Sequence, residues 1–199
     1  MAAPVILASG SRTRLELLHR AGVTVTAEAA AVDEGEIKAA FQAEGASTEA
    51  CAQALAALKA KRISDRHPAA LVIGADQMLD CDGIWFDKPA DLDGARTHLQ
   101  ALRGKTHRLV TAAVVMQGGS QLWHVISQAK LTMRPVSDAF LDDYLHQAGT
   151  AVLSSVGAYQ LEGLGIQLFD KVEGDFFTVL GLPLLPVLAA LRAHGILAP

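Results

Sequence analysis

The feature that most constrains the fold is the alternation of strand-like and helix-like patterns along the chain. An apolar run at residues 4–8 leads into a helical pattern, and the run at 70–79 is continuous and bounded by polar turns, as in a buried strand. Apolar segments at 107–116 and 121–133 flank the turn QGGS and predict a long hairpin. Interleaved helices and strands with hairpins predict an α/β fold in which helices flank a mixed β-sheet.

The other predicted elements follow from turn and capping residues. They are a strand at 23–29, two helices divided at Gly45 with Thr48 capping the second, a hairpin turn at 80–83, a helix at 91–102 and a helix from Ser137 to Gly149. A glycine-rich segment follows, and then an uncharged stretch at 176–191. This stretch is shorter than the roughly 18–20 residues of a membrane span and contains Gly181, Pro183 and Pro186. It predicts a buried strand, a loop and a helix.

Composition excludes several classes of protein. The 199 residues are 51% hydrophobic and 19% charged, which predicts one globular α/β domain over residues 1–199. A net charge of −4 argues against a general nucleic-acid partner and a polybasic membrane patch. Cys51 and Cys81 provide neither a disulfide framework nor a CxxC pair. The first residues lack the basic region and the long apolar run of a signal peptide, so a cytoplasmic protein is predicted.

The stretch LASGSRTRLELL at residues 7–18 contains two arginines at the start of a predicted helix. Ser11 is the predicted N-cap, and Arg12 and Arg14 lie in the first turn, where the helix dipole is already positive. A phosphate would resolve this conflict, because free backbone N–H groups, serines and arginines together bind anions. In the alternative, both arginines extend into solvent and Ser11 only caps the helix.

Carboxylates and lysines supply the other candidate site residues. Asp76 is expected at the carboxyl end of the buried strand, where α/β folds place ligands, and could be a metal ligand or the base for a water nucleophile. A turn-forming or capping aspartate is the simpler alternative. Glu34 lies at a helix start, where the helix dipole alone explains an acidic residue. Lys59 and Lys88, taken singly, are explained as solvated surface lysines. Glu162 lies in the glycine-rich loop GAYQLEGLG, which could enclose a base or ribose.

Familiar catalytic motifs are missing from the sequence. It contains no P-loop, no dinucleotide-binding G-x-G-x-x-G after a strand, no H-E-x-x-H, no G-x-S-x-G and no zinc deaminase pattern. The seven histidines form no cluster with ligand spacing. The chemistry therefore depends on carboxylates, basic side chains and a hard metal ion.

Taken together, the chain resembles the Maf family of nucleoside triphosphate pyrophosphatases over nearly its whole length. The segments that carry the resemblance are LASGSRTRLELL, VDE, LAALKAKR, VIGADQML, DKP, LRGKTH, GAYQLEGLGI and VEGDFFTVLGLPLLPVL. The resemblance implies an elongated, two-lobed, mixed α/β fold of the inosine triphosphate pyrophosphatase type and a homodimer. It also implies cleavage of a nucleoside triphosphate between the α and β phosphates with Mg²⁺ or Mn²⁺.

The same resemblance implies roles for individual residues. Ser9, Ser11 and Arg14 match the phosphate-holding motif, and Lys59 and Lys88 match two active-site lysines. Glu162 is predicted to contact the substrate from its place in the glycine-rich loop, not from the resemblance. Asp76 matches the catalytic acid, which would act on a water molecule aimed at the α-phosphorus. Glu34, together with Asp76, matches the metal-binding carboxylates.

Departures from the family pattern concern Arg12 and substrate choice. The family commonly has S-P-R-R where this chain has S-R-T-R at residues 11–14. Arg14 alone keeps its basic position in the motif, so Arg12 is a weaker candidate than Arg14. Ser154 and Ser155 replace the Asp-Lys of the branch that resembles dTTP and UTP hydrolases. Gln77 resembles the 7-methyl-GTP branch, whereas Gln160 replaces the lysine usual there. The expected substrate is therefore a modified or non-standard nucleotide. A non-catalytic nucleotide-binding regulator of cell division, or another metal-dependent phosphatase, remains the alternative.

Overall fold

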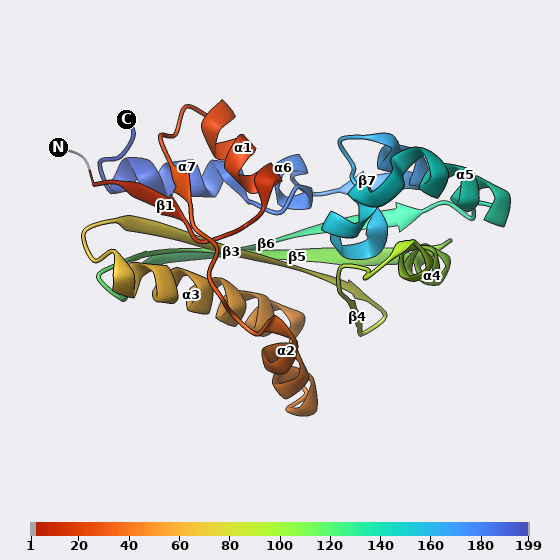
Figure 1. Cartoon of the computed structure of the whole chain (residues 1–199), viewed down its shortest axis with the longest axis horizontal. Coiled ribbons are helices and arrows are strands. Elements are labelled where there is room, and N and C mark those ends of the chain that lie inside the picture. Colours follow the sequence, from red (N-terminus) through yellow and green to blue (C-terminus); the bar gives the residue numbers. More distant parts are fainter. Residues whose placement is uncertain (1–2, 199) are drawn as a thin grey trace. The chain divides into compact units, whose positions relative to one another are not determined.

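The computed structural model describes residues 3–198, and its seven strands form one open sheet (Figure 1). The strand order is β2-β1-β3-β5-β6-β7, and β4 pairs with β3. β1 runs parallel to β2 and β3, whereas β4 is antiparallel to β3 and β7 to β6. The strands are β1 (Val5–Leu7), β2 (Thr26–Ala27), β3 (Leu71–Cys81), β4 (Ile84–Phe86), β5 (Thr106–Gln117), β6 (Ser120–Met133) and β7 (Phe169–Glu173). The predicted α/β fold with a mixed sheet is confirmed.

Seven α-helices and three 3₁₀ helices complete the described chain. The α-helices are α1 (Arg12–Arg20), α2 (Glu34–Ala43), α3 (Thr48–Arg66), α4 (Leu92–Leu102), α5 (Asp138–Ala148), α6 (Phe176–Val179) and α7 (Leu184–Ala193). The 3₁₀ helices are η1 (Gly149–Ser154), η2 (Val156–Ala158) and η3 (Leu164–Leu168). Within residues 3–198, no helix combines the length and the apolar character needed to cross a membrane.

The chain divides into two compact units, each built from separate segments. The first unit contains the described residues up to Asp76, Thr111–Ser127 and the described residues from Gly181 onward. The second contains Gln77–Val110 and Gln128–Leu180. Strands β3, β5 and β6 contribute residues to both units. The prediction of one domain over the whole chain stays a prediction.

In the first unit, helices lie on both faces of the sheet (Figure 1). α1 and α7 are on one side and α3 is on the other. These three helices each bury apolar side chains, with Leu18, Leu55 and Leu191 fully inaccessible to solvent. The Gly118–Gly119 turn between β5 and β6 is held against α3, because the Gly119 N–H donates to the Ser64 hydroxyl at 2.9 Å.

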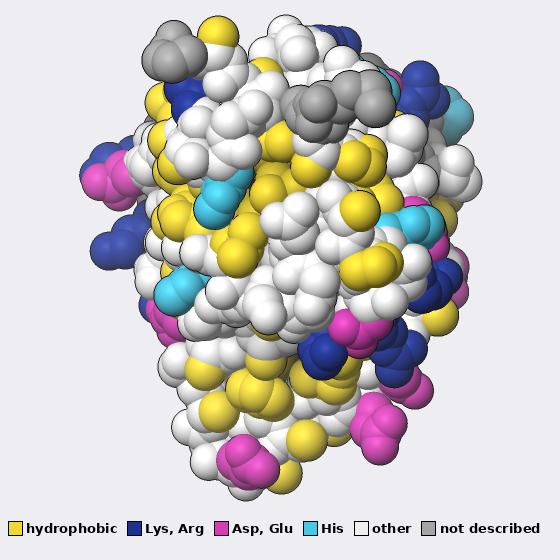
Figure 2. Space-filling view, turned by 90° about the vertical axis from the view of Figure 1, so that its left-hand side faces the viewer, with side chains coloured by type: hydrophobic (Ala, Val, Ile, Leu, Met, Phe, Trp, Pro, Cys, Tyr) yellow, Lys and Arg dark blue, Asp and Glu magenta, His cyan; other side chains and the backbone are white. Residues whose placement is uncertain are grey.

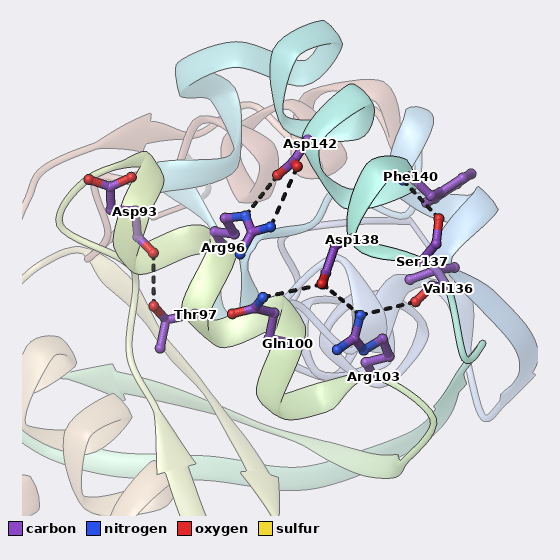
Figure 3. Close-up of polar contacts among 10 residues, drawn as sticks. All are labelled: Asp93, Arg96, Thr97, Gln100, Arg103, Val136, Ser137, Asp138, Phe140 and Asp142. Carbon is purple, nitrogen blue, oxygen red and sulfur yellow. Dashed lines mark hydrogen bonds and ion pairs between the residues drawn. The ribbon is translucent and has the colours of Figure 1, made fainter.

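The second unit has its own hydrophobic core beneath α4 and α5. On the surface of these helices, Arg96 donates to Asp142 at 2.7 Å, and Asp138 accepts from Arg103 at 2.8 Å and Gln100 at 3.3 Å (Figure 3). Such exposed pairs contribute only about 0–1 kcal/mol each, so the buried apolar residues provide most of the stability. These core residues include Leu79, Leu99, Leu102, Leu109, Leu131 and Leu141.

A buried histidine lies inside the second unit. His107 is fully inaccessible to solvent, and its Nε2 lies 2.7 Å from the Tyr159 hydroxyl. Its Nδ1 has no hydrogen-bond partner among the described residues. Burial lowers the pKa of His107 to about 4, because charging the ring there would sacrifice hydration. His107 is therefore neutral at pH 7.

Several local predictions are wrong. Ser47 caps α3, because its side chain accepts from Ala50 N at 3.2 Å, and Thr48 is already helical. The second strand shrinks from 23–29 to Thr26–Ala27. Residues 176–179 form a short helix where a strand was expected, because Asp175 caps Thr178 N at 2.8 Å. The glycine-rich segment also contains the unpredicted strand β7, which pairs with β6.

Figure 2 shows one face of the molecule on which Lys and Arg side chains lie beside Asp and Glu side chains, with hydrophobic side chains between them. Charges of opposite sign therefore alternate on this face and do not form one basic patch. This mixture agrees with the small net charge of −4.

Candidate active site

The loop between β1 and α1 is organised by two serines. Ser11 is the N-cap of α1, as predicted, and its hydroxyl accepts from Arg14 N at 3.4 Å. Ser9 is buried, and its hydroxyl accepts from Ser11 N at 3.2 Å. Both hydroxyls therefore have structural partners, and the loop is held in one conformation at the positive end of the helix.

The two arginines of the first turn have different environments. The Arg12 side chain is 90% exposed and pairs with Glu16 one turn later. Arg14 instead donates from Nε to Gly181 O at 2.6 Å and from Nη1 to Ala75 O at 2.9 Å. Two carbonyl oxygens thus offset the positive charge at the helix start. The alternative in which both arginines extend into solvent holds for Arg12 and is wrong for Arg14.

Arg14 also remains able to bind an anion. Its Nη1 reaches Ser9 Oγ at 3.2 Å, whereas its Nη2 makes no hydrogen bond to any of the residues 3–198. Burial lowers the pKa of Arg14, and the nearby carboxylates of Asp76 and Glu34 act against this shift. A guanidinium fixed by three acceptors presents its remaining N–H groups in a defined direction.

Lys59 joins two carboxylates from different elements. Its ammonium lies 2.6 Å from Asp76 Oδ1 on β3 and 2.6 Å from Glu34 Oε1 at the start of α2. The side chains of Lys59 and Asp76 are 9% and 5% exposed, whereas that of Glu34 is 42% exposed. The structure therefore brings together six predicted site residues: Ser9, Ser11, Arg14, Glu34, Lys59 and Asp76.

Asp76 occupies the interior of β3, and its predicted position at the strand end is wrong. Within β3, the residues that pair with β1 are Leu71–Ile73, and the strand continues to Cys81, with Leu79–Cys81 paired with β4. Asp76 therefore lies just beyond the region paired with β1. Burial raises the pKa of Asp76, while Lys59 and Arg14 lower it. A buried carboxylate with a raised pKa is a better proton acceptor than a surface aspartate.

The second oxygen of Asp76 bears on the metal prediction. Asp76 Oδ2 is buried and has no hydrogen-bond partner among the described residues. No group of three or more His, Cys, Asp or Glu side chains in residues 3–198 has the arrangement of a metal site. Mg²⁺ is commonly bound by one or two carboxylates together with water and substrate phosphates. Asp76 and Glu34 fit such an ion, which would need the substrate to complete its coordination.

Lys88 and Glu162 belong to the second unit. Lys88 is exposed after β4, and Glu162 is exposed in the turn before η3. Their roles stay predictions. Gln77 also lies in this unit, where its amide donates to Thr178 O at 2.9 Å and Val179 O at 3.1 Å, linking β3 to α6.

Two residues at which this chain departs from the patterns of the family branches contact one another. Gln160 Nε2 donates to Ser154 Oγ at 3.2 Å, and Ser154 in turn donates to Ala151 O at 2.8 Å. Two of the three positions at which this chain departs from the charged patterns of those branches therefore form one neutral hydrogen-bonded pair.

Sequence reasoning missed the main-chain groups of the site. The carbonyls of Ala75 and Gly181 hold Arg14, yet a carbonyl oxygen leaves no mark on residue type. For the Ala75 carbonyl, the sequence offered one signal, which is that Ala75 directly precedes the candidate residue Asp76. Gly181 lies 167 residues from Arg14, so only the fold could reveal that contact.

Comparison with known proteins gives a consistent assignment. The sequence model of the Maf-like protein family matches residues 4–194. The chain is 59% identical to a nucleoside triphosphate pyrophosphatase of Paramagnetospirillum magneticum, across 98% of this chain and 100% of that protein. A protein of the same name from Rhodospirillum rubrum is 54% identical, across 98% and 96% of the two chains. A 7-methyl-GTP pyrophosphatase of Mesorhizobium japonicum is 50% identical, across 98% of each. The chain belongs to the Maf-like protein family.

Proposed function

We propose that this protein is a nucleoside triphosphate pyrophosphatase. The observation that carries the proposal is Asp76, a buried carboxylate with one oxygen bound to Lys59 and the other without a partner among the described residues. The names of the similar proteins support the same reaction. The products would be a nucleoside monophosphate and pyrophosphate.

The reaction assigns a task to each residue of the site. Asp76 Oδ2 accepts a proton from a water molecule, whose oxygen forms a bond to the α-phosphorus. The bond between the α-phosphorus and the bridging oxygen breaks, and pyrophosphate leaves. Lys59 and Arg14 stabilise the negative charge that develops on the leaving group. Ser9 and Ser11 fix the loop that orients Arg14.

A divalent cation fits the same proposal. Glu34 and Asp76 would hold Mg²⁺ or Mn²⁺, and such an ion supplies charge neutralisation at the phosphates when bound. Lys59 then separates the two carboxylates in the absence of substrate and prevents their mutual repulsion.

For the substrate, we propose a modified or non-standard nucleotide of the 7-methyl-GTP type in preference to dTTP or UTP. Three similar proteins, at 50%, 48% and 46% identity, are named 7-methyl-GTP pyrophosphatase. The neutral pair Gln160–Ser154 replaces charged residues expected in either branch. Lys88 is proposed as a substrate contact on the basis of the family resemblance, and Glu162 on the basis of its glycine-rich loop.

A product-resolved hydrolysis screen tests these assignments. The panel contains the common ribo- and deoxyribonucleoside triphosphates, 7-methyl-GTP, pseudouridine triphosphate and 5-methyl pyrimidine triphosphates, each with Mg²⁺ or Mn²⁺. Monophosphate and pyrophosphate from a narrow group of nucleotides are expected. Orthophosphate as the product would assign the site to another phosphatase class. A folded protein that binds nucleotides without turnover would instead be a nucleotide-binding regulator.

Two further proposals concern the protein as a whole. We propose a cytoplasmic homodimer, on the basis of the family resemblance. Light scattering coupled to size-exclusion chromatography measures the mass directly, and 20.9 kDa would identify a monomer.

A further inference from the structure

Helix α3 packs unusually close to strand β3 at Gly74. A Cβ atom at this position would overlap the carbonyl oxygen of Ala56, and would lie 2.8 Å from Ala60 Cβ and 3.0 Å from Ala60 N. The contact partners are mostly main-chain atoms of the helix, which cannot rotate away as a flexible side chain could. Only glycine therefore permits this separation of helix and strand.

The close contact is adjacent to the proposed catalytic pair. Gly74 and Asp76 are two residues apart on β3, so their side-chain positions lie on the same face of the sheet. On α3, Lys59 precedes Ala60 and follows Ala56 by three residues, which is less than one helical turn. The atoms that meet at Gly74 therefore belong to the same turn of α3 that carries Lys59.

The stretch of α3 that meets the strand consists of small residues. Ala52, Ala56 and Ala60 recur every four residues and are all fully buried. Spacing of four residues places them on one face of the helix. Small side chains on the helix and glycine on the strand both reduce the distance between the two backbones, while Lys59 Nζ remains 2.6 Å from Asp76 Oδ1.

We infer that Gly74 is a positioning residue, whose missing side chain lets α3 approach β3 closely enough for Lys59 to bind Asp76 and Glu34 together. The inference rests on the proposed function. A larger residue would displace the helix, and a buried lysine stem has little freedom to compensate. Misplacement of a catalytic group by about 1 Å can cost on the order of 100-fold in rate.

A double-mutant cycle between Gly74→Ala and Lys59→Met tests the inference. Each single variant is expected to lower kcat by on the order of 10- to 100-fold. In the double variant, the loss should be close to that of one variant alone, because both remove the same interaction. Losses that multiply would show that Gly74 acts independently of Lys59, and would overturn the inference.

A crystal structure of Gly74→Ala gives a readout that needs no turnover. The distance from Lys59 Nζ to Asp76 Oδ1, 2.6 Å in the parent protein, should exceed the hydrogen-bond limit of about 3.5 Å in the variant. A distance that stays near 2.6 Å would overturn the inference. If the parent protein releases no pyrophosphate, the proposed function fails, but this distance still decides the role of Gly74.

Two further variants separate positioning from general destabilisation. Leu191→Ala on α7 removes fully buried apolar atoms of the same unit without changing either partner of the Gly74 contact. It should lower stability and leave the coupling between Lys59 and Asp76 unchanged. If Gly74→Ala does not fold, Ala60→Val enlarges the opposite side of the contact, and the same cycle with Lys59→Met then decides the outcome.

Discussion

The ammonium of Lys59 lies 2.6 Å from Asp76 Oδ1, while Asp76 Oδ2 is buried without a hydrogen-bond partner among residues 3–198. One oxygen of the carboxylate therefore binds the Lys59 ammonium, and the other accepts no hydrogen bond from residues 3–198. This division suits a residue that must stay ionised and still accept a proton. Because of this division, the contributions of Lys59 and Asp76 can be measured separately by mutation.

Lys59→Met should destabilise the protein by about 3–5 kcal/mol, because it leaves a buried carboxylate without its partner. The acid limb of the pH dependence of kcat/KM should move to higher pH, since Lys59 lowers the pKa of Asp76. Urea unfolding and the pH–rate profile measure the two effects. Lys61→Met is the control, because Lys61 is exposed on the same helix and, among residues 3–198, forms its ion pair with Asp65. Equal effects of the two variants would contradict the assigned role of Lys59.

Asp76→Asn should reduce kcat by about 10²- to 10⁴-fold while nucleotide binding persists, because the amide keeps the shape but cannot accept the proton. Isothermal titration calorimetry and product analysis separate binding from turnover. Asp80→Asn changes another buried aspartate of β3, which pairs with Arg108 at 2.6 Å. That control should lose stability and keep its catalytic mechanism. Full turnover by Asp76→Asn would remove Asp76 from the reaction.

Arg14→Lys should lower both stability and activity, although the charge is kept. A lysine cannot donate in fixed directions to Gly181 O, Ala75 O and a phosphate at the same time. Arg12→Lys is the matched variant from the same helical turn, and it should change the free energy of unfolding by less than about 0.5 kcal/mol. Thermal unfolding and KM for the triphosphate provide the test, and an unaffected Arg14→Lys enzyme would refute it.

Glu34→Gln should raise the Mg²⁺ concentration required for half-maximal activity by on the order of 10-fold, because it removes one of two proposed carboxylate ligands. Glu36→Gln removes an exposed carboxylate from the same first turn of α2 and serves as the control. Chelation by EDTA should abolish activity in all three proteins, and Mg²⁺ should restore it. Activity that persists in EDTA would exclude the metal from the mechanism.

Stability should fall as the pH is lowered from about 6.5 to 4, because the unfolded protein binds a proton at His107 that the folded protein excludes. With a folded pKa of about 4 and an unfolded value near 6.5, the loss reaches about 3 kcal/mol by pH 4. His107→Gln should flatten this part of the pH dependence in urea unfolding. The exposed His146→Gln variant should retain it, and a parent protein with no loss of stability over this range would contradict the prediction.

The sequence by itself determined most of the element types and boundaries and identified the candidate side chains of the site. Apolar periodicity located the long strands β3, β5 and β6, and capping residues located α1 and α5, because these signals are local. The resemblance selected Arg14, Glu34 and Lys59, which the fold gathers around Asp76. Predictions failed where a local signal was weak, as at the two-residue strand β2, or where pairing with a distant strand decided the outcome, as at β7.

Only the tertiary structure decided which arginine of the first turn is held by the protein and how Asp76 is divided between its two oxygens. Arg12 and Arg14 have the same side chain, and the carbonyl groups that distinguish them come from residues 61 and 167 positions away from Arg14. The distance between Lys59 and Asp76 likewise depends on the close packing of α3 at Gly74. Main-chain atoms and packing distances are not encoded in any single residue, so they emerge only when the chain is folded.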